Sequence, residues 1–286
     1  MDPAPAGGFE EFVAIVARLR APDGCPWDRA QTHATLRTHM LEEAYEAVAA
    51  IDEGDHAHLA DELGDVLLQV VLHAQIAADE GAFTIGDVTA GISEKIRRRH
   101  PHIFGDAVAA TPEEVMHRWD AIKAGERANA AAGEADAPGA PAAEPSALDG
   151  VTPTLPALMY AQKISRRAVA VGFEWEDLDG VWTKVHEEID ELKATEPGSP
   201  EAAHEVGDLL FTVVNLARKQ GLDAETCLRE ACERFSARFR DMERRAREDG
   251  VTLQGMHIED MEGRWQAAKA RVSGAAAAKR EGDDRT

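Results

Sequence analysis

Two pairs of acidic residues at helical spacing are the residues of this chain best suited to chemistry. Glu43 and Glu46 are three positions apart, and so are Glu62 and Asp65, so that each pair lies on one face of a helix. Four carboxylates that converge between two antiparallel helices repel one another unless a cation or protons neutralise them. Hard oxygen ligands without His or Cys favour Mg²⁺, with Mn²⁺ as the alternative, held by carboxylates together with substrate phosphates.

A simpler interpretation is that these acids form a solvated helix face, as acidic residues on helices usually do. The surroundings argue against it. The segment from Thr38 to Glu94 contains thirteen Asp or Glu residues and no Lys or Arg, so its helices lack the basic partners at i,i+4 that a solvated helix normally carries. Glu62 and Asp65 also run directly into the apolar sequence VLLQVV. The pattern therefore predicts a cation supplied from outside the segment.

The acidic pattern occurs twice in the chain. LEEAYE aligns with HEEIDE, ELGDVLLQVVLHA aligns with EVGDLLFTVVNLA, and RWDAIKA aligns with RWQAAKA, all in the same order. Ordered matches of this kind predict two tandem copies of one fold. The acids that the second copy supplies are Glu188, Glu191, Glu205 and Asp208.

Cationic and aromatic residues accompany each acidic set. In the first copy Lys95 and Arg99 share a helix face, and Trp119 lies one turn before Lys123. Such cations beside a metal suit a polyphosphate, because the metal bridges some of its oxygens and the cations hold others. A Trp at this place can stack on a base or wall it off. The second copy carries Arg234, Arg238, Trp265 and Lys269.

Both copies are predicted to be helical throughout, because apolar residues recur at helical spacing and no stretch alternates with period two. Each copy is expected to be an αα-hairpin that carries EExxE and ExxD, with turns at 53–55 and 196–201. Asp28 with Gln31 fits a capping box before the helix that contains Leu36. Further helices are predicted at 9–20, 84–99, 112–123 and 155–170.

Composition separates the two copies. The segment 125–153 is rich in Ala, Gly, Pro and acids and offers almost nothing large to bury, which predicts a linker between a domain at 1–124 and a domain at 154–272. The tail at 273–286 is equally poor in core residues and is expected to be disordered. Gly64 and Gly207 each cost about 1 kcal/mol inside a helix, and the close approach of a neighbouring helix or a ligand would explain them.

Net charge and cysteine usage exclude several classes of protein. The formal charge of −22 argues against binding to bare nucleic acid or to anionic membranes. The apolar stretches are shorter than the roughly 20 residues that span a bilayer, and the first eight residues lack a signal pattern, so a cytoplasmic location is expected. Three cysteines without a CxxC pair argue against a disulfide framework and against a zinc finger.

Histidine-based metal sites are a weaker alternative. The His-x-His sequences at 56–58 and 100–102 have no counterparts in the repeat, so they are interpreted as turn residues. The ExxH sequences at 114–117 and 201–204 have the spacing of di-iron helical bundles but do not align with each other, which leaves a di-iron protein as a minor alternative. The rival class without catalysis is a helical bundle in which one or both copies serve as an assembly module.

The ordered motifs resemble the MazG family of nucleoside triphosphate pyrophosphohydrolases. The resemblance covers nearly the whole chain apart from the linker and the tail. It implies an all-α, Mg²⁺-dependent and usually dimeric enzyme with two domains of the all-α NTP pyrophosphohydrolase type. Such an enzyme cleaves (d)NTPs to (d)NMP and pyrophosphate, which is a nucleotide-pool house-cleaning reaction. The motifs are CPWDRAQT, LEEAYE, DELGDVLLQV, RRHPHIFGD, AQKISRRA, VGFEW, EEIDEL and EVGDLLFTVVNLARK.

The resemblance also implies roles for individual residues. It makes the four acids of each copy the metal ligands and brings Trp265 near the nucleotide. Two positions depart from the family pattern: His204 stands where another acid is frequent, and Arg234 stands where Lys is common. The residues to which phosphate binding carries over are Lys163, Arg234, Arg238 and Lys269.

Two acids remain once four ligands are counted in each copy. Glu42 and Glu187 are therefore the candidates for orienting or deprotonating the attacking water. When the copies are aligned through their first Trp residues, Ile15 stands where the second copy has Lys163. A missing cation weakens the stabilisation of a polyphosphate transition state. The second copy is therefore predicted to be the better catalyst.

Overall fold

The computed structural model describes residues 7–112 and 146–283 and, between them, 114–115, 118–119, 122–123 and 125–126. The described residues form helices joined by turns and loops and contain no strand, which confirms the all-α prediction. The chain divides into two compact units, Met1–Ala140 and Pro141–Thr286, whose boundary falls within the segment 125–153. Among the described helices none is both long and apolar enough to span a membrane.

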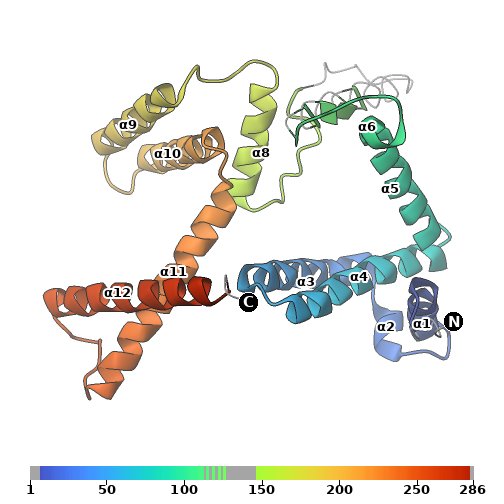
Figure 1. Ribbon diagram of the computed structural model, residues 1–286, viewed down its shortest axis with the longest axis horizontal. Coiled ribbons are helices and arrows are strands. Elements are labelled where there is room, and N and C mark those ends of the chain that lie inside the picture. The colour runs from blue at the N-terminus through green and yellow to red at the C-terminus, as the bar shows by residue number, and fades with distance from the viewer. Residues whose placement is uncertain are drawn as a thin grey trace. The chain divides into compact units, whose positions relative to one another are not determined.

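The first unit is built on a long helical hairpin (Figure 1). Gly54 ends its first helix in the left-handed conformation, with a φ of 72° that glycine adopts without steric cost. Asp55 then caps the second helix, because its Oδ1 atom accepts hydrogen bonds from the backbone N–H groups of Ala57 and His58. The predicted turn at 53–55 is confirmed. The helices are α1 (Phe9–Arg20), α2 (Pro26–Ala30), α3 (His33–Glu53), α4 (His56–Asp79), α5 (Ile85–Arg99) and α6 (Pro101–Phe104).

The start of α3 differs from the sequence prediction. Thr32 is the N-cap residue, its hydroxyl accepting from the Thr35 N–H at 3.2 Å while the Thr35 hydroxyl accepts from the Thr32 N–H at 2.9 Å. The capping box predicted at Asp28 and Gln31 is wrong. Asp28 lies within the short helix α2, and Gln31 is the residue that ends it. The extended residue whose side chain accepts from the first turn of α3 is Thr32.

An apolar cluster joins α1 to the hairpin of the first unit. Its buried members are Val16, Leu36, Val71, Leu72 and Ile76. Arg20 also connects these elements by hydrogen bonds. Its guanidinium donates to Asp79 Oδ2 at 2.8 Å and to the carbonyl of Gln31 at 3.2 Å. Helix α1 and the entrance to α3 are thereby tied to the far end of α4.

The second unit repeats the hairpin. Ser199 caps its second helix, the Ala202 N–H donating to the Ser199 hydroxyl at 3.0 Å, and Pro200 occupies the first helical position, as is common at helix starts. The predicted turn at 196–201 is confirmed. The core contains Val181, Val185 and Leu216. The helices are α8 (Ala157–Val169), α9 (Leu178–Ala194), α10 (Pro200–Lys219), α11 (Ala224–Glu248) and α12 (Ile258–Asp283).

Buried polar side chains fix α8 against its neighbours in the second unit. The Ser165 hydroxyl donates to the side-chain oxygen of Asn215 on α10. Gln162 is 2% exposed and spans the loop between α10 and α11, its Nε2 donating to the carbonyl of Leu222 at 2.9 Å and its Oε1 accepting from the N–H of Ala224 at 2.8 Å. These bonds satisfy polar groups that are costly to bury alone.

Two further predictions concern the ends of the units. Helix α12 packs against α11, which it crosses in Figure 1. It continues to Asp283, where the composition predicted a disordered tail from residue 273. The alanine-rich sequence of this segment has high helix propensity, which accounts for the difference. The helix predicted at 112–123 lies partly outside the described residues, although 114–115, 118–119 and 122–123 are helical.

Candidate functional site

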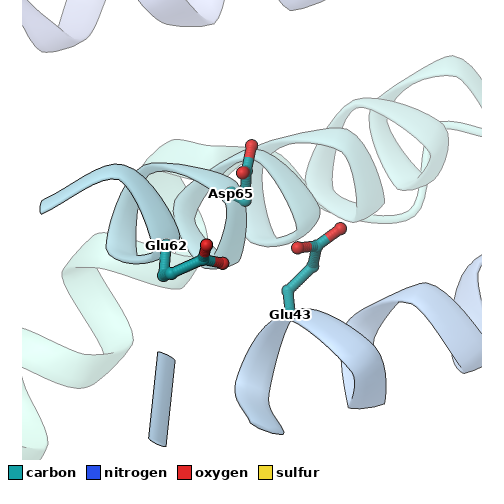
Figure 2. Close-up of side chains that lie close together, drawn as sticks. All are labelled: Glu43, Glu62 and Asp65. Atoms are coloured by element: carbon teal, nitrogen blue, oxygen red, sulfur yellow. The ribbon is translucent and has the colours of Figure 1, made fainter. Parts of the chain in front are cut away.

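Three of the predicted acids of the first copy come together between α3 and α4. Glu43 from α3 and Glu62 and Asp65 from α4 each offer a carboxylate oxygen within 4.8 Å of the others. Figure 2 shows the Glu43 side chain extending from α3 toward α4, which carries Glu62 and Asp65. The i,i+3 spacing on α4 and the antiparallel hairpin produce this convergence, as the sequence predicted.

The described residues compensate the charge of this cluster poorly. Burial raises the pKa of Glu43, and the negative charges of Asp65 and Glu46 raise it further. Glu62 accepts through Oε1 from His58 Nε2 at 3.0 Å, whereas its Oε2 atom is buried and has no hydrogen-bond partner among the described residues. An orphaned carboxylate oxygen beside two further acids is the environment that a divalent cation with oxygen ligands fits.

The second copy builds the same cluster with a different charge balance. Glu188 from α9 meets Glu205 and Asp208 from α10, again with oxygens within 4.8 Å of one another, and Glu188 is only 4% exposed. The Lys184 ammonium lies 2.8 Å from Oε1 of Glu188 and 2.8 Å from Oε1 of Glu187. These two carboxylates raise the pKa of Lys184.

Sequence reasoning missed Lys184, although a signal was available. Lys184 precedes Glu188 by four residues, a spacing that places the two side chains together on a helix. In the alignment of LEEAYE with HEEIDE its counterpart is His39, which lies 3.2 Å from Glu42. A cation therefore contacts the acids of the second copy directly, where the first copy has a histidine that is charged only when protonated.

The fourth predicted ligand of each copy lies beside the cluster rather than within it. Glu46 raises the pKa of Glu43 through its charge and a side-chain hydrogen bond. Burial raises the pKa of Glu191; the negative charges of Glu188 and Glu205 add to this rise, while Lys184 opposes it. Glu46 and Glu191 therefore interact electrostatically with the clusters, and their role as ligands stays a prediction.

The two candidate proton acceptors are exposed on α3 and α9 and already have partners. Glu42 pairs with His39, and Glu187 pairs with Lys184. Each lies directly before the first ligand of its copy in the sequence, so each faces away from the cluster by about 100° around the helix axis. Their catalytic role stays a prediction.

The predicted substrate cations of the first copy have different surroundings. Arg99 binds Oε2 of Glu126 at 2.6 Å, and hydrogen bonds from Arg99 and Arg98 lower the pKa of Glu126 to about 2. The Lys123 ammonium lies 4.0 Å from the centre of the Trp119 ring, a cation–π geometry. Lys95 is exposed on α5.

The predicted substrate residues of the second copy lie on three helices. Trp265 of α12 packs on Phe235 of α11 with ring centres 5.1 Å apart. Arg234 pairs with Glu230 at 3.2 Å, and Arg238 Nε is buried and has no hydrogen-bond partner in the part of the chain that the structure describes. Lys163 on α8 and Lys269 on α12 are exposed. Within the described part of the chain, no hydrogen bond or ion pair joins this set to the acidic cluster.

Gly64 and Gly207, the glycines between the two acids of α4 and of α10, have open surroundings. A Cβ atom added at Gly64 or Gly207 would meet no heavy atom within 4 Å. The expectation that a neighbouring helix approaches these positions is therefore wrong for the described part of this chain. A ligand or a second chain is the remaining explanation that the sequence offered.

Histidine enters the site only indirectly. Neither three-acid cluster found among the described residues includes a histidine, so the di-iron alternative receives no support. His204 is exposed, and His117 lies outside the described residues. His58, interpreted from the sequence as a turn residue, instead contacts Glu62 and also lies 3.0 Å from Glu53.

Comparison with known proteins decides the family. The chain is 44% identical over 262 residues to the nucleoside triphosphate pyrophosphohydrolase/pyrophosphatase MazG of Thermotoga maritima, an alignment that covers 91% of this chain and 95% of the relative. It is also 44% identical over 266 residues to the nucleoside triphosphate pyrophosphohydrolase of Escherichia coli K12, with 91% and 97% covered. The chain belongs to the MazG family of nucleoside triphosphate pyrophosphohydrolases.

The two copies of this MazG protein match differently described families. Residues 31–104 match the MazG nucleotide pyrophosphohydrolase domain, and residues 159–235 match phosphoribosyl-ATP pyrophosphohydrolase. Each matched range contains one three-acid cluster. The predicted membership in an enzyme family is confirmed, and a MazG protein with two diverged copies replaces the interpretation as a bundle without catalysis.

Proposed function

We propose that this enzyme hydrolyses (deoxy)nucleoside triphosphates to nucleoside monophosphate and pyrophosphate with Mg²⁺, or alternatively Mn²⁺, as a house-cleaning reaction of the cytoplasmic nucleotide pool. The observation that carries the proposal is the under-neutralised acidic cluster, above all the orphaned Oε2 of Glu62 beside the raised pKa of Glu43. A cluster of three carboxylates that attracts a divalent cation suits a substrate that brings phosphate oxygens of its own.

Different residues of this chain would bind the metal, accept the proton and hold the phosphates. A bound divalent cation would supply Lewis-acid chemistry to the phosphate oxygens. The carboxylates of the two helices hold it, with Glu188, Glu205 and Asp208 as the set in the second copy. Glu187 accepts a proton from the water that attacks the α-phosphorus, and the bond to the bridging oxygen breaks, so that pyrophosphate leaves. Lys163 and Arg234 hold phosphate oxygens.

A homodimer belongs to the same proposal, because each hairpin exposes apolar residues at aligned positions. Leu63 is 52% exposed and its counterpart Val206 44%, while Leu67 is 40% exposed and its counterpart Leu210 53%. Exposed apolar side chains repeated on one face are typical of an interface. A second copy of this chain could cover this face and bring its own cations, such as Lys269, to the acidic clusters.

The test is a turnover panel on the full chain with product identification. The purified protein is incubated with each (d)NTP with and without Mg²⁺, and nucleotide and phosphate products are separated by chromatography. We expect monophosphate and pyrophosphate, formed only with the metal. The matched control is the double variant Glu43→Gln with Glu188→Gln, which should be inactive. Diphosphate with orthophosphate as main products would contradict the proposed bond cleavage.

A further inference from the structure

Helix α4, which carries Glu62 and Asp65, also carries a buried amide whose oxygen has no hydrogen-bond partner among the described residues. Gln69 of α4 is 6% exposed, and its Oε1 atom is buried without a hydrogen-bond partner among the described residues. Buried polar atoms are nearly always paired, because desolvation without a hydrogen bond is costly. The proposed reaction does not use this residue.

Gln69 shares a helix face with two of the acids. Glu62, Asp65 and Gln69 follow the i, i+3, i+7 spacing and form one stripe along α4. Gln69 lies four residues beyond Asp65, about 6 Å further along the helix axis. The second orphaned acceptor, Glu62 Oε2, lies at the other end of the stripe. Two unpaired oxygens therefore flank Asp65 on the face that meets Glu43 of α3.

The stripe on α4 is apolar beyond Gln69. Leu72, three residues further along the helix, belongs to the buried apolar cluster and offers no hydrogen-bond donor. The cation site at Glu43, Glu62 and Asp65 is the polar end of the same stripe.

We propose that Gln69 is a positioning residue of the first copy's cation site, whose amide oxygen accepts a hydrogen bond from a water molecule carried by the cation. The proposal rests on the divalent cation of the proposed function. Mg²⁺ retains several of its waters and holds oxygen ligands at about 2.0–2.1 Å. A water molecule between the cation and the amide adds the length of a hydrogen bond, about 2.8 Å, to this distance. The cation can therefore interact through water with a side chain one helical turn from Asp65.

The second copy lacks this amide. The residue aligned with Gln69 is Thr212, which is 4% exposed and has a shorter side chain without a carbonyl group. Groups that hydrogen-bond to a metal's ligands commonly change metal affinity by about 10–100-fold. Because Thr212 replaces Gln69 in the second copy, we expect the two cation sites of one chain to differ in Mg²⁺ affinity although their carboxylates match.

The test measures Mg²⁺ binding at the first copy alone, in the full chain. The reference protein carries Glu205→Gln with Asp208→Asn, which disables the second cluster, and Mg²⁺ is titrated calorimetrically without nucleotide. Gln69→Met removes the oxygen at nearly constant side-chain size, and Gln69→Glu retains an oxygen acceptor. The matched control is Gln75→Met on the same helix, where the amide donates to Asp79 at 2.7 Å.

We expect Gln69→Met to weaken Mg²⁺ binding about 10-fold, while Gln69→Glu and Gln75→Met leave it unchanged or tighter. The metal-free melting temperature of Gln69→Met should stay the same or rise, because an unsatisfied buried amide is removed; a merely structural role would lower it. Unchanged Mg²⁺ affinity in Gln69→Met overturns the inference alone. A reference protein that binds no Mg²⁺ overturns the proposed cation site and the inference with it.

Discussion

The two hairpins carry the same acids but neutralise them differently. In the second copy Lys184 contacts Glu188 directly at 2.8 Å. In the first copy one oxygen of Glu62 has no partner within the described ranges, and the groups that contact its acids there are histidines such as His58. The matched spacing of the carboxylates thus brings three acids together in each copy. Under the proposed function, the residues one turn away set how strongly the metal-free chain attracts a cation.

Removing one of two matched acids at a time tests most directly which copy is the better catalyst. Glu188→Gln should lower pyrophosphate release by about 100-fold, because it removes a ligand from the copy with Lys163 and Lys184. Glu43→Gln should lower it less than about threefold. Both variants are assayed in the full chain at saturating Mg²⁺ and nucleotide. The reverse order would make the first copy the main catalyst.

The exposed faces of the two hairpins can be compared with matched charges. Leu210→Glu and Leu67→Glu each place a carboxylate at an aligned apolar position, and both should weaken the proposed dimer by about 10-fold or more, because a buried unpaired charge is strongly unfavourable. Leu210 is the more exposed of the two and should give the larger effect. Light scattering over a concentration series measures the dissociation. A monomeric wild-type chain would refute the dimer.

Removing the Lys184 ammonium tests whether it affects Mg²⁺ binding more than the histidines of the first copy do. Lys184→Met leaves the buried carboxylate of Glu188 unpaired, so the metal-free chain should lose about 1–3 kcal/mol of unfolding free energy. Mg²⁺ should then raise the melting temperature by more than it does in the wild type, because it no longer competes with an ammonium. His39→Met is the matched control and should change the Mg²⁺ shift little.

The pH dependence of metal binding should reflect the raised pKa of Glu43. A carboxyl whose folded pKa is raised binds a proton more tightly in the folded state, so the metal-free fold gains stability as pH falls towards that pKa. Mg²⁺ needs the deprotonated form. Its stabilising shift, measured in the chain with Glu205→Gln and Asp208→Asn, should therefore be full near pH 8 and shrink as the solution becomes acidic. A shift that is constant down to pH 4.5 would contradict this.

The smallest expected effects come from the helical glycines. Gly64→Ala and Gly207→Ala meet open space, so each should add about 0.5–1 kcal/mol of stability through helix propensity. Activity measured in parallel separates the two explanations of these glycines. Loss of turnover in a more stable variant would indicate that a ligand or a second chain approaches that helix.

Local rules predicted much of the hairpin and its acids from the sequence. Spacing of three on each helix and a glycine suited to positive φ at residue 54 were sufficient to bring Glu43 to Glu62. The cap at Thr32 could not be separated from Asp28 by pattern alone, because both precede residues able to complete a box. The choice depended on where the short helix α2 ends, which tertiary packing determines.

The cationic part of the site was less predictable for a different reason. Arg99 was identified by its helical spacing, but its ion pair with Glu126 joins residues 27 positions apart, and no local rule reports such a partner. Trp265 and Lys269 could be located on one helix face from the sequence. Helical spacing does not say which acids these side chains meet, because that depends on the packing of α12 and on any second chain.

Gln162 affects how two chains of the proposed dimer associate. By holding the loop before α11 at both Leu222 and Ala224, it narrows the range of directions in which α11 leaves the hairpin. The aligned residue of the first copy is Ala14, whose methyl group cannot do this. In the proposed dimer a narrower range raises the effective concentration of the α11 and α12 cations near the partner's acids. It also reduces the conformational entropy lost on association.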